Sequence, residues 1–439
     1  MERLDNYRLD TIFADHKSDA ATNSNNGSEN KNTSHKASRI GSGSKNNSDI
    51  ICFSHLRWDF VFQRPQHLLT RCSSRQRVFF MEDPIFMPGI KSHLEISRRD
   101  HELHIIVPKL SDTFSPDTAV VVQQKLLDSL LQEYGIEDFL LWYYTPMALG
   151  FSQHLSPMAT IYDCMDELSS FKGAPRSLRE YEAELFGKAD VVFTGGQSLY
   201  EYKKNCHHNI HPFPSSIDAA HFAKARKLAD DVPDQLNIPH PRIGFCGVID
   251  ERLDIDLLRE VADMRPDWHL VMLGPVVKID PAILPQRHNI HYLGGKKYEE
   301  LPHYLAGWDV AMMPFALNES TRFISPTKTP EYLAAGRPVV SAPLQDVVRP
   351  YGERNLVRIA GTPEEFVQVV EGLLENEKYS SEWLRRVDDF LSSNSWDSTW
   401  SRMMDLIDKA ISDGLYESAQ ELEVLSVGQQ SMIIDTATA

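Results

Sequence analysis

The hydrophobic residues of this chain recur in short runs that are bounded by turn residues. Runs of this kind are typical of strands that are buried on both faces of a parallel sheet. In the first part of the chain the predicted strands cover residues 49–54, 78–81, 104–107, 139–143, 160–162, 191–194 and 209–213. A second series covers residues 242–246, 269–273, 290–293, 310–313, 338–341 and 356–359.

Helical periodicity separates several of these runs. Residues 123–134 and 178–188 carry apolar side chains three and four positions apart, which is the spacing of a helix with one buried face. Strands that alternate with helices predict an α/β fold with parallel, doubly wound sheets. Residues 226–241 are charged and contain prolines, and they predict a linker between the two series. Two consecutive α/β domains therefore fit the chain better than one large sheet.

The same pattern divides the chain into six segments. Polar, Ser- and Asn-rich residues 1–48 predict a disordered tail, because they hold too few large apolar side chains to offset the entropy of ordering. The first domain covers 49–225, the linker 226–241 and the second domain 242–391. An amphipathic helix is expected at 392–414, with Trp396, Trp400, Met403 and Ile407 in one stripe, and a flexible tail at 415–439.

Composition removes several classes of function. The net charge of −17 over 439 residues argues against nucleic-acid binding, which requires a clustered cationic face. No apolar run approaches the ~20 residues that span a bilayer, and the N-terminus lacks the apolar core of a signal peptide, so we expect a cytoplasmic protein. The five cysteines are scattered without a CxxC pair, which indicates neither a disulfide framework nor a zinc site.

The segment 321–341, TRFISPTKTPEYLAAGRPVVS, combines a polar loop, a short helix of small residues and a strand. Pro330 suits the first turn of a helix, which places Glu331 in that turn and Lys328 just before it. A cation beside the unpaired N–H groups of a helix start favours an anion, and a carboxylate there can accept sugar hydroxyls. On its own, the pair is explained better by a helix dipole and a solvated lysine.

Two glycine loops follow predicted strands of the second domain. Ligands of open α/β sheets bind beyond the carboxyl ends of the strands, so these loops are candidate binding sites. Gly244 and Gly247 end the first of these strands, and Gly274 ends the next. Their spacing does not match the GxGxxG pattern of dinucleotide-binding domains, and no acidic residue ends the next strand. A dinucleotide site is therefore a poor explanation.

Longer segments resemble the glycosyltransferases of GT-B architecture, in the superfamily that includes polysaccharide and teichuronic-acid-type transferases. The segments that carry the resemblance are RWDFVFQRPQHLL (57–69), YDCMDELSSFKG (162–173), ADVVFTGGQSLYE (189–201), HPFPSSIDAAHF (211–222), FCGVID (245–250), PDWHLVMLGP (266–275), NIHYLGGKKYEELPHYLAGWDVAMMPF (289–315) and PTKTPEYLAAGRPVVSAP (326–343). The resemblance runs from about residue 50 to 406. It implies two Rossmann-like domains that face a cleft, with the last helix crossing back to the first domain.

The resemblance also implies roles for residues of the second domain. Glu331 resembles the glutamate that binds the donor ribose, and Lys328 the cation that neutralises the diphosphate, with Arg322 and Ser325 assisting. The remaining residues expected at the donor nucleotide are Gly247, Arg252, Gly274, Gly294 and Tyr298. The glycines and Tyr298 are explained equally well as parts of plain turns.

The chain departs from the family pattern at two positions. Many retaining members carry a second glutamate eight residues before the one that matches Glu331, and here that residue is Phe323. They also often carry a Lys-Gly pair after the first strand of the donor domain, where this chain has Arg252, Leu253 and Asp254. Retention and inversion of the anomeric configuration therefore both stay open.

In the first domain, Asp163, Asp166 and Glu167 follow a predicted strand and are expected to face the cleft, and Asp163 and Asp166 are the candidate catalytic bases. An inverting transferase needs a carboxylate within ~3 Å of the acceptor hydroxyl, although each aspartate could equally be an N-cap or a turn residue. The loop after the first strand offers aromatic and polar groups that suit a sugar. The expected acceptor-binding residues are Arg57, Trp58, Arg64 and His67.

We therefore expect a metal-independent glycosyltransferase that uses a nucleotide diphosphate sugar as donor, needs no further cofactor, and acts on a glycan, polysaccharide or lipid-linked acceptor. No DxD motif ends a strand of the first domain, and Asp254-Ile255-Asp256 falls in a predicted helix. A lipid-linked acceptor would bring the protein to the inner face of the membrane. Two alternatives stay open: a nucleotide-sugar epimerase on the same fold, and a non-catalytic binding or scaffold protein. The sequence does not specify an oligomeric state.

Overall fold

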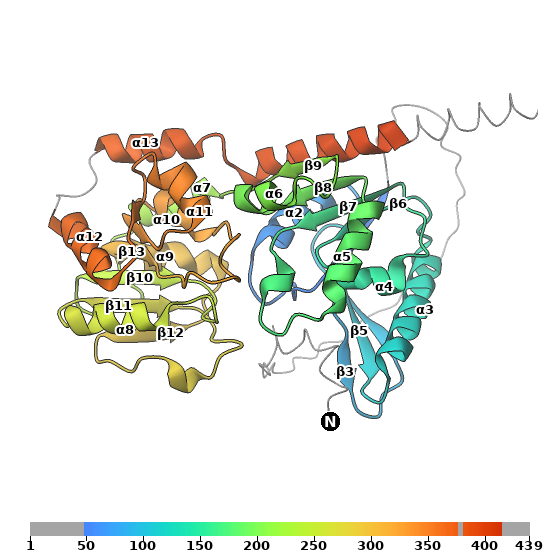
Figure 1. The fold of residues 1–439 in the computed structure, drawn as a ribbon, viewed down its shortest axis with the longest axis horizontal. Helices are drawn as coiled ribbons and strands as arrows, with labels where there is room; N and C mark the ends of the chain where they lie inside the picture. Colours follow the sequence, from blue (N-terminus) through green and yellow to red (C-terminus); the bar gives the residue numbers. More distant parts are fainter. Residues whose placement is uncertain (1–47, 376–380, 415–439) are drawn as a thin grey trace, which may run out of the picture.

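The computed structural model describes residues 48–375 and 381–414. They form two α/β halves, each with a central sheet between layers of helices (Figure 1). The tails expected at 1–48 and 415–439 lie outside the described residues, except for Ser48. The fold class expected from the sequence, two Rossmann-like halves, is confirmed.

The first half holds a nine-stranded sheet in the order β3-β5-β2-β1-β6-β7-β8-β9, with β4 paired to β5. Its strands are β1 (Asp49–Ser54), β2 (Val78–Glu82), β3 (Ile85–Met87), β4 (His93–Arg98), β5 (Leu103–Ser111), β6 (Phe139–Tyr143), β7 (Ala159–Cys164), β8 (Val191–Thr194) and β9 (Ile210–Pro212). Its helices are α2 (Arg64–Ser73), α3 (Pro116–Tyr134), α4 (Leu149–Ser152), α5 (Ser177–Lys188) and α6 (Gln197–Lys203). The short helix α7 (Ala219–Phe222) follows β9 in sequence but packs in the second half, where Phe222 joins a buried cluster (Figure 1).

Two strands of this sheet, β3 and β4, are absent from the sequence prediction, and β4 runs antiparallel to β5. The first half is therefore a mixed sheet and not a wholly parallel one. The side chains of β4 are half-buried or exposed and include charged residues, because this strand lies at the periphery of the sheet. A strand of that kind lacks the continuous apolar run by which the buried strands are found.

The second half holds a six-stranded, all-parallel sheet in the order β12-β11-β10-β13-β14-β15. Its strands are β10 (Arg242–Cys246), β11 (His269–Leu273), β12 (Ile290–Gly294), β13 (Val310–Met313), β14 (Val339–Ser341) and β15 (Arg358–Ile359). Its helices are α8 (Ile255–Met264), α9 (Leu301–Ala306), α10 (Lys328–Ala334), α11 (Gln345–Val347), α12 (Pro363–Glu375) and α13 (Ser381–Leu391). The order reverses between β10 and β13, which is where doubly wound sheets bind ligands.

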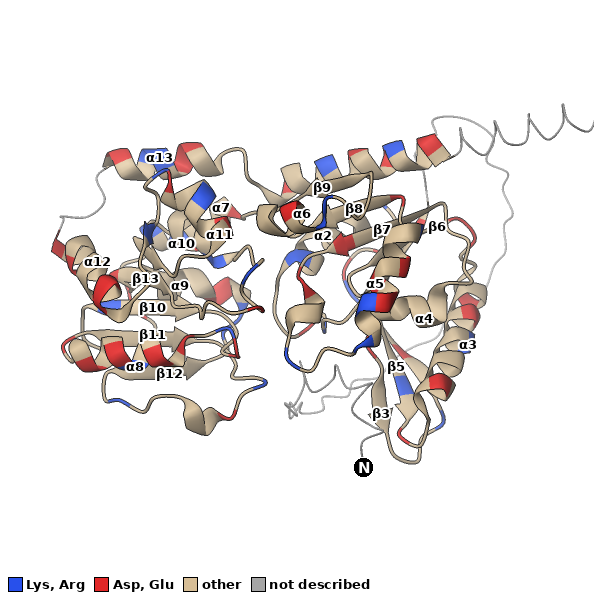
Figure 2. Ribbon diagram, in the orientation of Figure 1, with Lys and Arg blue, Asp and Glu red and all other residues tan. Residues whose placement is uncertain are grey.

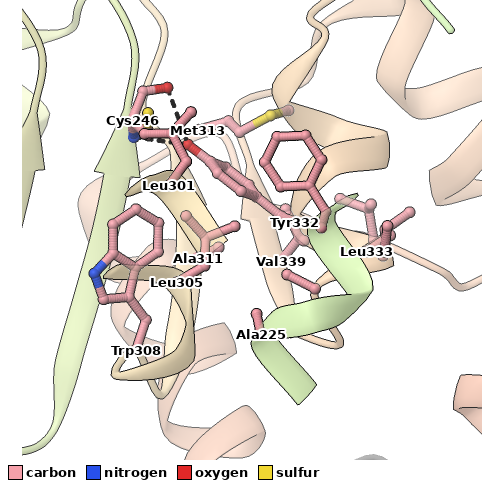
Figure 3. Close-up of a cluster of buried hydrophobic side chains, with 14 of the residues drawn as sticks. Ala225, Cys246, Leu301, Leu305, Trp308, Ala311, Met313, Tyr332, Leu333 and Val339 are labelled. Carbon is pink, nitrogen blue, oxygen red and sulfur yellow. Dashed lines mark hydrogen bonds between the residues drawn. The ribbon is translucent and has the colours of Figure 1, made fainter. Parts of the chain in front are cut away.

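The helix α10 is fixed to β10 through Tyr332. Its wholly buried phenol accepts a hydrogen bond of 2.7 Å from the backbone N–H of Cys246 and donates one of 3.2 Å to the Cys246 carbonyl (Figure 3). Around it, Trp308, Leu305 and Met313 belong to the same buried cluster. The sequence predicts that Lys328 lies just before this helix, whereas in the structure the helix begins at Lys328. Lys328 is therefore part of the first turn together with Glu331.

A long C-terminal helix, residues 396–414, crosses back over the first half (Figure 1). Trp396, Trp400, Met403 and Ile407 are buried and join a core cluster that contains Ile50 and Trp142 of the first sheet. The apolar stripe predicted from the sequence is therefore buried against the first sheet. The helix itself begins at residue 396 and not at the predicted residue 392. It covers one face of the first sheet.

Acidic residues recur along the outward-facing helices α3 and α8 (Figure 2). Within the described residues, none of the helices combines the length and the apolar content that a bilayer crossing would require.

Candidate functional site

Three adjoining cavities of about 690, 160 and 60 Å³ lie where the two halves face each other. Val61 of the first half and Val248 of the second line all three. The loops that follow β1, β7, β10 and β11 meet here, at the carboxyl ends of parallel strands in both sheets. The fold therefore creates one continuous cleft between the halves.

Lys328 lines both the 690 Å³ and the 160 Å³ cavity. Its Nζ lies 2.6 Å from Oε2 of Glu331. Burial acts to lower the pKa of Lys328, but the Glu331 carboxylate outweighs it and raises that pKa, so the ammonium group stays charged. Ser325 lines the 160 Å³ cavity beside Lys328. Glu331 is 7% exposed, stands behind Lys328 and is not among the residues that line the three cavities.

The two glycine loops form one wall of the 690 Å³ cavity. Gly274 has φ +147°, and a Cβ there would lie 1.7 Å from the carbonyl oxygen of Gly247, so that only glycine fits. Gly247 and Gly274 both line this cavity. Gly294 accepts the Gly274 N–H through its carbonyl at 2.9 Å but is not a lining residue, whereas the next residue, Gly295, is.

Tyr298 joins the two halves through its ring. It stacks on His221 with 4.4 Å between ring centroids and lies 4.8 Å from the ring of Phe62, which belongs to the loop after β1. Both Tyr298 and Phe62 line the 690 Å³ cavity. Residues of both halves therefore build this aromatic surface, and Tyr298, which the sequence analysis expected at the donor nucleotide, is part of it.

The two arginines expected at the donor are placed differently. Arg252 lines the two smaller cavities, with its guanidinium 2.8 Å from Oδ2 of Asp250. The side chain of Arg322 is 60% exposed, faces Glu319 at 3.8 Å and is not among the lining residues. Its sequence neighbour Phe323, at the position of the second glutamate of related enzymes, stacks on Tyr202 of the first half at 4.6 Å. The structure gives no support for a donor contact by Arg322.

The two candidate bases have different environments. Asp166 lines both smaller cavities. Burial raises the pKa of Asp166, while the cations Arg252, Lys278 and Arg64 oppose this rise. Asp163 is wholly buried, and its carboxylate is held by the Arg64 guanidinium at 2.8 Å. The structure thus brings Asp166 to the cleft and gives Asp163 a buried ion pair instead.

Of the four residues expected to bind the acceptor, only Trp58 and Arg64 line a cavity. The guanidinium of Arg64 is occupied by Asp163 and by the Phe213 carbonyl at 2.7 Å. Arg57 donates to Glu82 at 3.0 Å. The His67 ring stacks on Trp396 of the C-terminal helix at 4.4 Å. These polar groups hold the loop after β1 in place, and this loop presents three aromatic side chains to the cleft together with Asp59, Val61 and Gln63.

Sequence reasoning missed Lys278, which lines the 60 Å³ cavity and lies 4.7 Å from the ring centre of Phe171 across the cleft. Burial lowers the pKa of Lys278 to about 8. It also missed His55, which is buried at the end of β1 and whose pKa burial lowers to about 4. Both follow predicted strands within a few residues, a signal that could have identified them.

Chemically, a partly buried cation from one half and a carboxylate from the other line the same cavity, next to a space lined by glycine backbone and aromatic rings. Among the described residues there is no group of three or more His, Cys, Asp or Glu side chains arranged to hold a metal ion.

Residues 240–376 match the family model described as Glycosyl transferases group 1. A relative from Bacillus subtilis (strain 168), named as the teichuronic acid biosynthesis glycosyltransferase TuaH, is 27% identical over 220 residues. The match covers 46% of this chain and 55% of TuaH, so the chain spans about half the length of this curated relative.

Solved structures extend the likeness in fold to both halves. Sucrose-phosphate synthase from Thermosynechococcus elongatus superposes with a TM-score of 0.64 at 13% identity, over 83% of this chain and 100% of that one. Trehalose 6-phosphate synthase from Burkholderia multivorans gives 0.60 at 13%, over 84% and 98%. The Anabaena protein HepE, solved with UDP and glucose, gives 0.57 at 13%, over 82% and 99%. The chain therefore has the two-domain fold of these structures, and its residues 240–376 form a domain similar to the Glycosyl transferases group 1 family.

Proposed function

We propose that the protein transfers a sugar from a nucleotide diphosphate sugar to a hydroxyl of a glycan, polysaccharide or lipid-linked acceptor. The observation that carries this proposal is the 160 Å³ cavity, which Lys328 of the second half and Asp166 of the first half both line. The family match over residues 240–376 and the teichuronic acid in the name of the relative TuaH support a polysaccharide acceptor.

In this proposal the nucleotide lies in the 690 Å³ cavity, along Gly247 and Gly274, with its base near Tyr298. Its diphosphate reaches Lys328 at the border with the 160 Å³ cavity. As the bond between the anomeric carbon and the phosphate oxygen breaks, negative charge grows on the diphosphate, and a preorganised cation stabilises it. The acceptor oxygen bonds to the anomeric carbon and gives its proton to the Asp166 carboxylate.

We propose that Lys328 supplies the charge for which other transferases use a divalent metal, so that transfer needs no metal and no cofactor besides the donor. Activity that is unchanged in excess EDTA supports this assignment. Activity that EDTA abolishes and Mg²⁺ or Mn²⁺ restores contradicts it, whichever sugar is transferred.

The experiment begins with a thermal-shift panel of nucleoside diphosphates and their sugars, because a bound ligand raises the midpoint in proportion to its affinity and concentration. The best ligand is then incubated with and without candidate acceptors. Conversion of the donor alone would indicate an epimerase, and absence of any shift would favour a non-catalytic protein.

For a lipid-linked acceptor we propose peripheral binding at the inner face of the membrane, which flotation with acceptor-containing vesicles measures.

The Lys328→Ala variant is expected to lose the ligand-induced shift and most of the transfer activity. The Arg322→Ala variant is the matched control, since it removes a neighbouring cation that the structure places outside the cavities. An equal loss in both variants, or in neither, would overturn the assignment of the diphosphate to Lys328.

A further inference from the structure

The short helix α6 of the first half is directly preceded by two glycines that each make a close contact. A Cβ on Gly195 would lie 2.0 Å from the carbonyl oxygen of Met165, the residue before Asp166. A Cβ on Gly196 would lie 2.1 Å from a carboxylate oxygen of Asp346, which belongs to the second half. The start of α6 therefore contacts both the loop that carries Asp166 and the opposite half of the molecule.

Further contacts tie α6 to the second half. Oδ1 of Asp346 accepts the backbone N–H of Ser198 at 2.9 Å in a buried position. One turn later Glu201 pairs with Arg349 at 2.8 Å, and Tyr202 stacks on Phe323. Phe323 is itself part of a buried cluster of the first half. The position of α6 thus depends on how the second half packs against the first.

The last residue of α6, Lys203, is buried within the first half with its side chain 5% exposed. Its Nζ lies 2.6 Å from Oε1 of Glu182 on α5 and 2.7 Å from Oε2 of Glu167. Burial alone would lower the pKa of Lys203, but Cys164, Glu182 and Glu167 outweigh it and raise that pKa. Removing one member of a buried ion pair leaves an uncompensated charge, so opening this network costs free energy.

Glu167 connects the network to the cleft, because it directly follows Asp166 in the loop after β7. Its second oxygen accepts the Ser169 hydroxyl at 2.6 Å, which closes the loop on itself. Glu167 is 8% exposed and is not among the residues that line the cavities, whereas Asp166 lines two of them. The backbone between these two side chains is thus fixed from the buried side.

We propose that Lys203 is a positioning residue. It holds the Asp166 loop through Glu167, and it links this loop through α6 to the packing of the second half against the first. The assignment rests on the proposed function in one respect, namely that Asp166 faces the acceptor. In mechanistic terms, the second half docks on α6 through Asp346, Arg349 and Phe323 and so sets the position of α6, and α6 sets the position of the carboxylate on the acceptor side.

The test of the positioning role is hydrogen exchange of the full chain, which needs no activity. The Glu167→Gln variant keeps the Lys203–Glu182 pair and removes the charge that fixes the loop, so it leaves the buried lysine compensated. We expect exchange at residues 165–171 to rise at least tenfold, with residues 242–360 unchanged. Lys203→Met should give the same pattern, and Lys204→Met, which alters an exposed neighbouring lysine, should match the wild type. Unchanged exchange at 165–171 in Glu167→Gln overturns the proposal.

Kinetics separate positioning from a structural role. We expect Glu167→Gln to lower kcat at least tenfold with donor affinity unchanged by calorimetry, and to shift the acid limb of the kcat profile. If the wild-type enzyme transfers sugar and the Glu167→Gln variant keeps the wild-type kcat and pH profile, the positioning role is overturned and the proposed function stays intact. A wild-type protein without transfer activity refutes the function, while the exchange experiment still decides whether Lys203 positions the loop.

The link to the second half is tested with Asp346→Ala. We expect faster exchange both in α6 and at residues 165–171, and partial rescue by Asp346→Asn, which keeps an oxygen acceptor for Ser198. Faster exchange that is confined to residues 197–203 would show that the packing of the second half on α6 does not affect the Asp166 loop.

Discussion

At the scale of single residues, side chains with the same chemistry have opposite roles because their burial differs. Asp163 and Asp166 are three positions apart, yet one is enclosed with Arg64 and the other faces the cleft. Lys328 lies at the cavities, whereas Arg322 in the preceding loop is exposed. Residue type and spacing suggested all four for the site, and only the packing separates them.

The Asp166→Asn variant is expected to lower kcat by about 10²- to 10⁴-fold, since it removes a proton acceptor. Because burial raises the pKa of Asp166, the wild-type rate should rise with pH through that pKa as the carboxyl group loses its proton. A pH profile of kcat measures this acid limb, which the variant should lack.

Asp163→Asn is the contrasting variant. It breaks a buried ion pair, which costs about 3–5 kcal/mol of folding free energy, so its main effect should appear in denaturant unfolding. An acid limb that vanishes in Asp163→Asn while stability is unchanged would contradict the assignment of the two aspartates.

At the scale of elements, the binding surface depends on how α10 meets β10. Tyr332 holds the backbone of Cys246, the residue before Gly247, and it lies four positions after Lys328 on the same helix. One phenol thus fixes the distance between the cation and the glycine loop. The peripheral strand β4 contributes nothing to this surface, which is why missing it in the sequence did not affect the site.

The Tyr332→Phe variant leaves two buried backbone groups of Cys246 without their phenol partner. We expect a loss of about 1–3 kcal/mol in the free energy of unfolding and weaker donor binding through displacement of Lys328. Urea unfolding and calorimetry measure the two effects. Tyr202→Phe, which removes an exposed hydroxyl, should leave both unchanged, and equal stability of the two variants would contradict the role of Tyr332.

At the scale of the whole molecule, the halves are joined by aromatic stacking and by the C-terminal helix. His67 of α2 stacks on Trp396 of that helix and lies 5.6 Å from the ring of Tyr298 in the second half. Burial, with contributions from Arg71, Lys328 and His221, lowers the pKa of His67 from 6.5 to about 3. In the folded protein His67 therefore stays neutral at pH values at which it is protonated in the unfolded chain.

This exclusion makes stability depend on pH. A folded pKa below the unfolded value means that stability is complete above pH 6.5 and is lost progressively as pH falls toward about 3. We expect His67→Phe to show a smaller loss of unfolding free energy between pH 7 and pH 4 than the wild type, as measured by urea unfolding. His93→Phe, an exposed control, should keep the wild-type slope, and an identical slope in all three proteins would contradict the assignment.

The sequence by itself determined the buried strands, the division into two halves, the packing stripe of the C-terminal helix and the place of Lys328 and Glu331 at the start of a helix. Each of these depends on local patterns, namely apolar runs, helical spacing and a proline in a first turn, which persist whatever the rest of the chain does. The tertiary structure decided which carboxylate faces the cleft, that Arg64 and His67 are held in packing contacts, and which partners Lys278, Tyr332 and Lys203 meet. These depend on contacts between residues tens to hundreds of positions apart, and burial, which sets the charge and reach of each side chain, exists only after those contacts form.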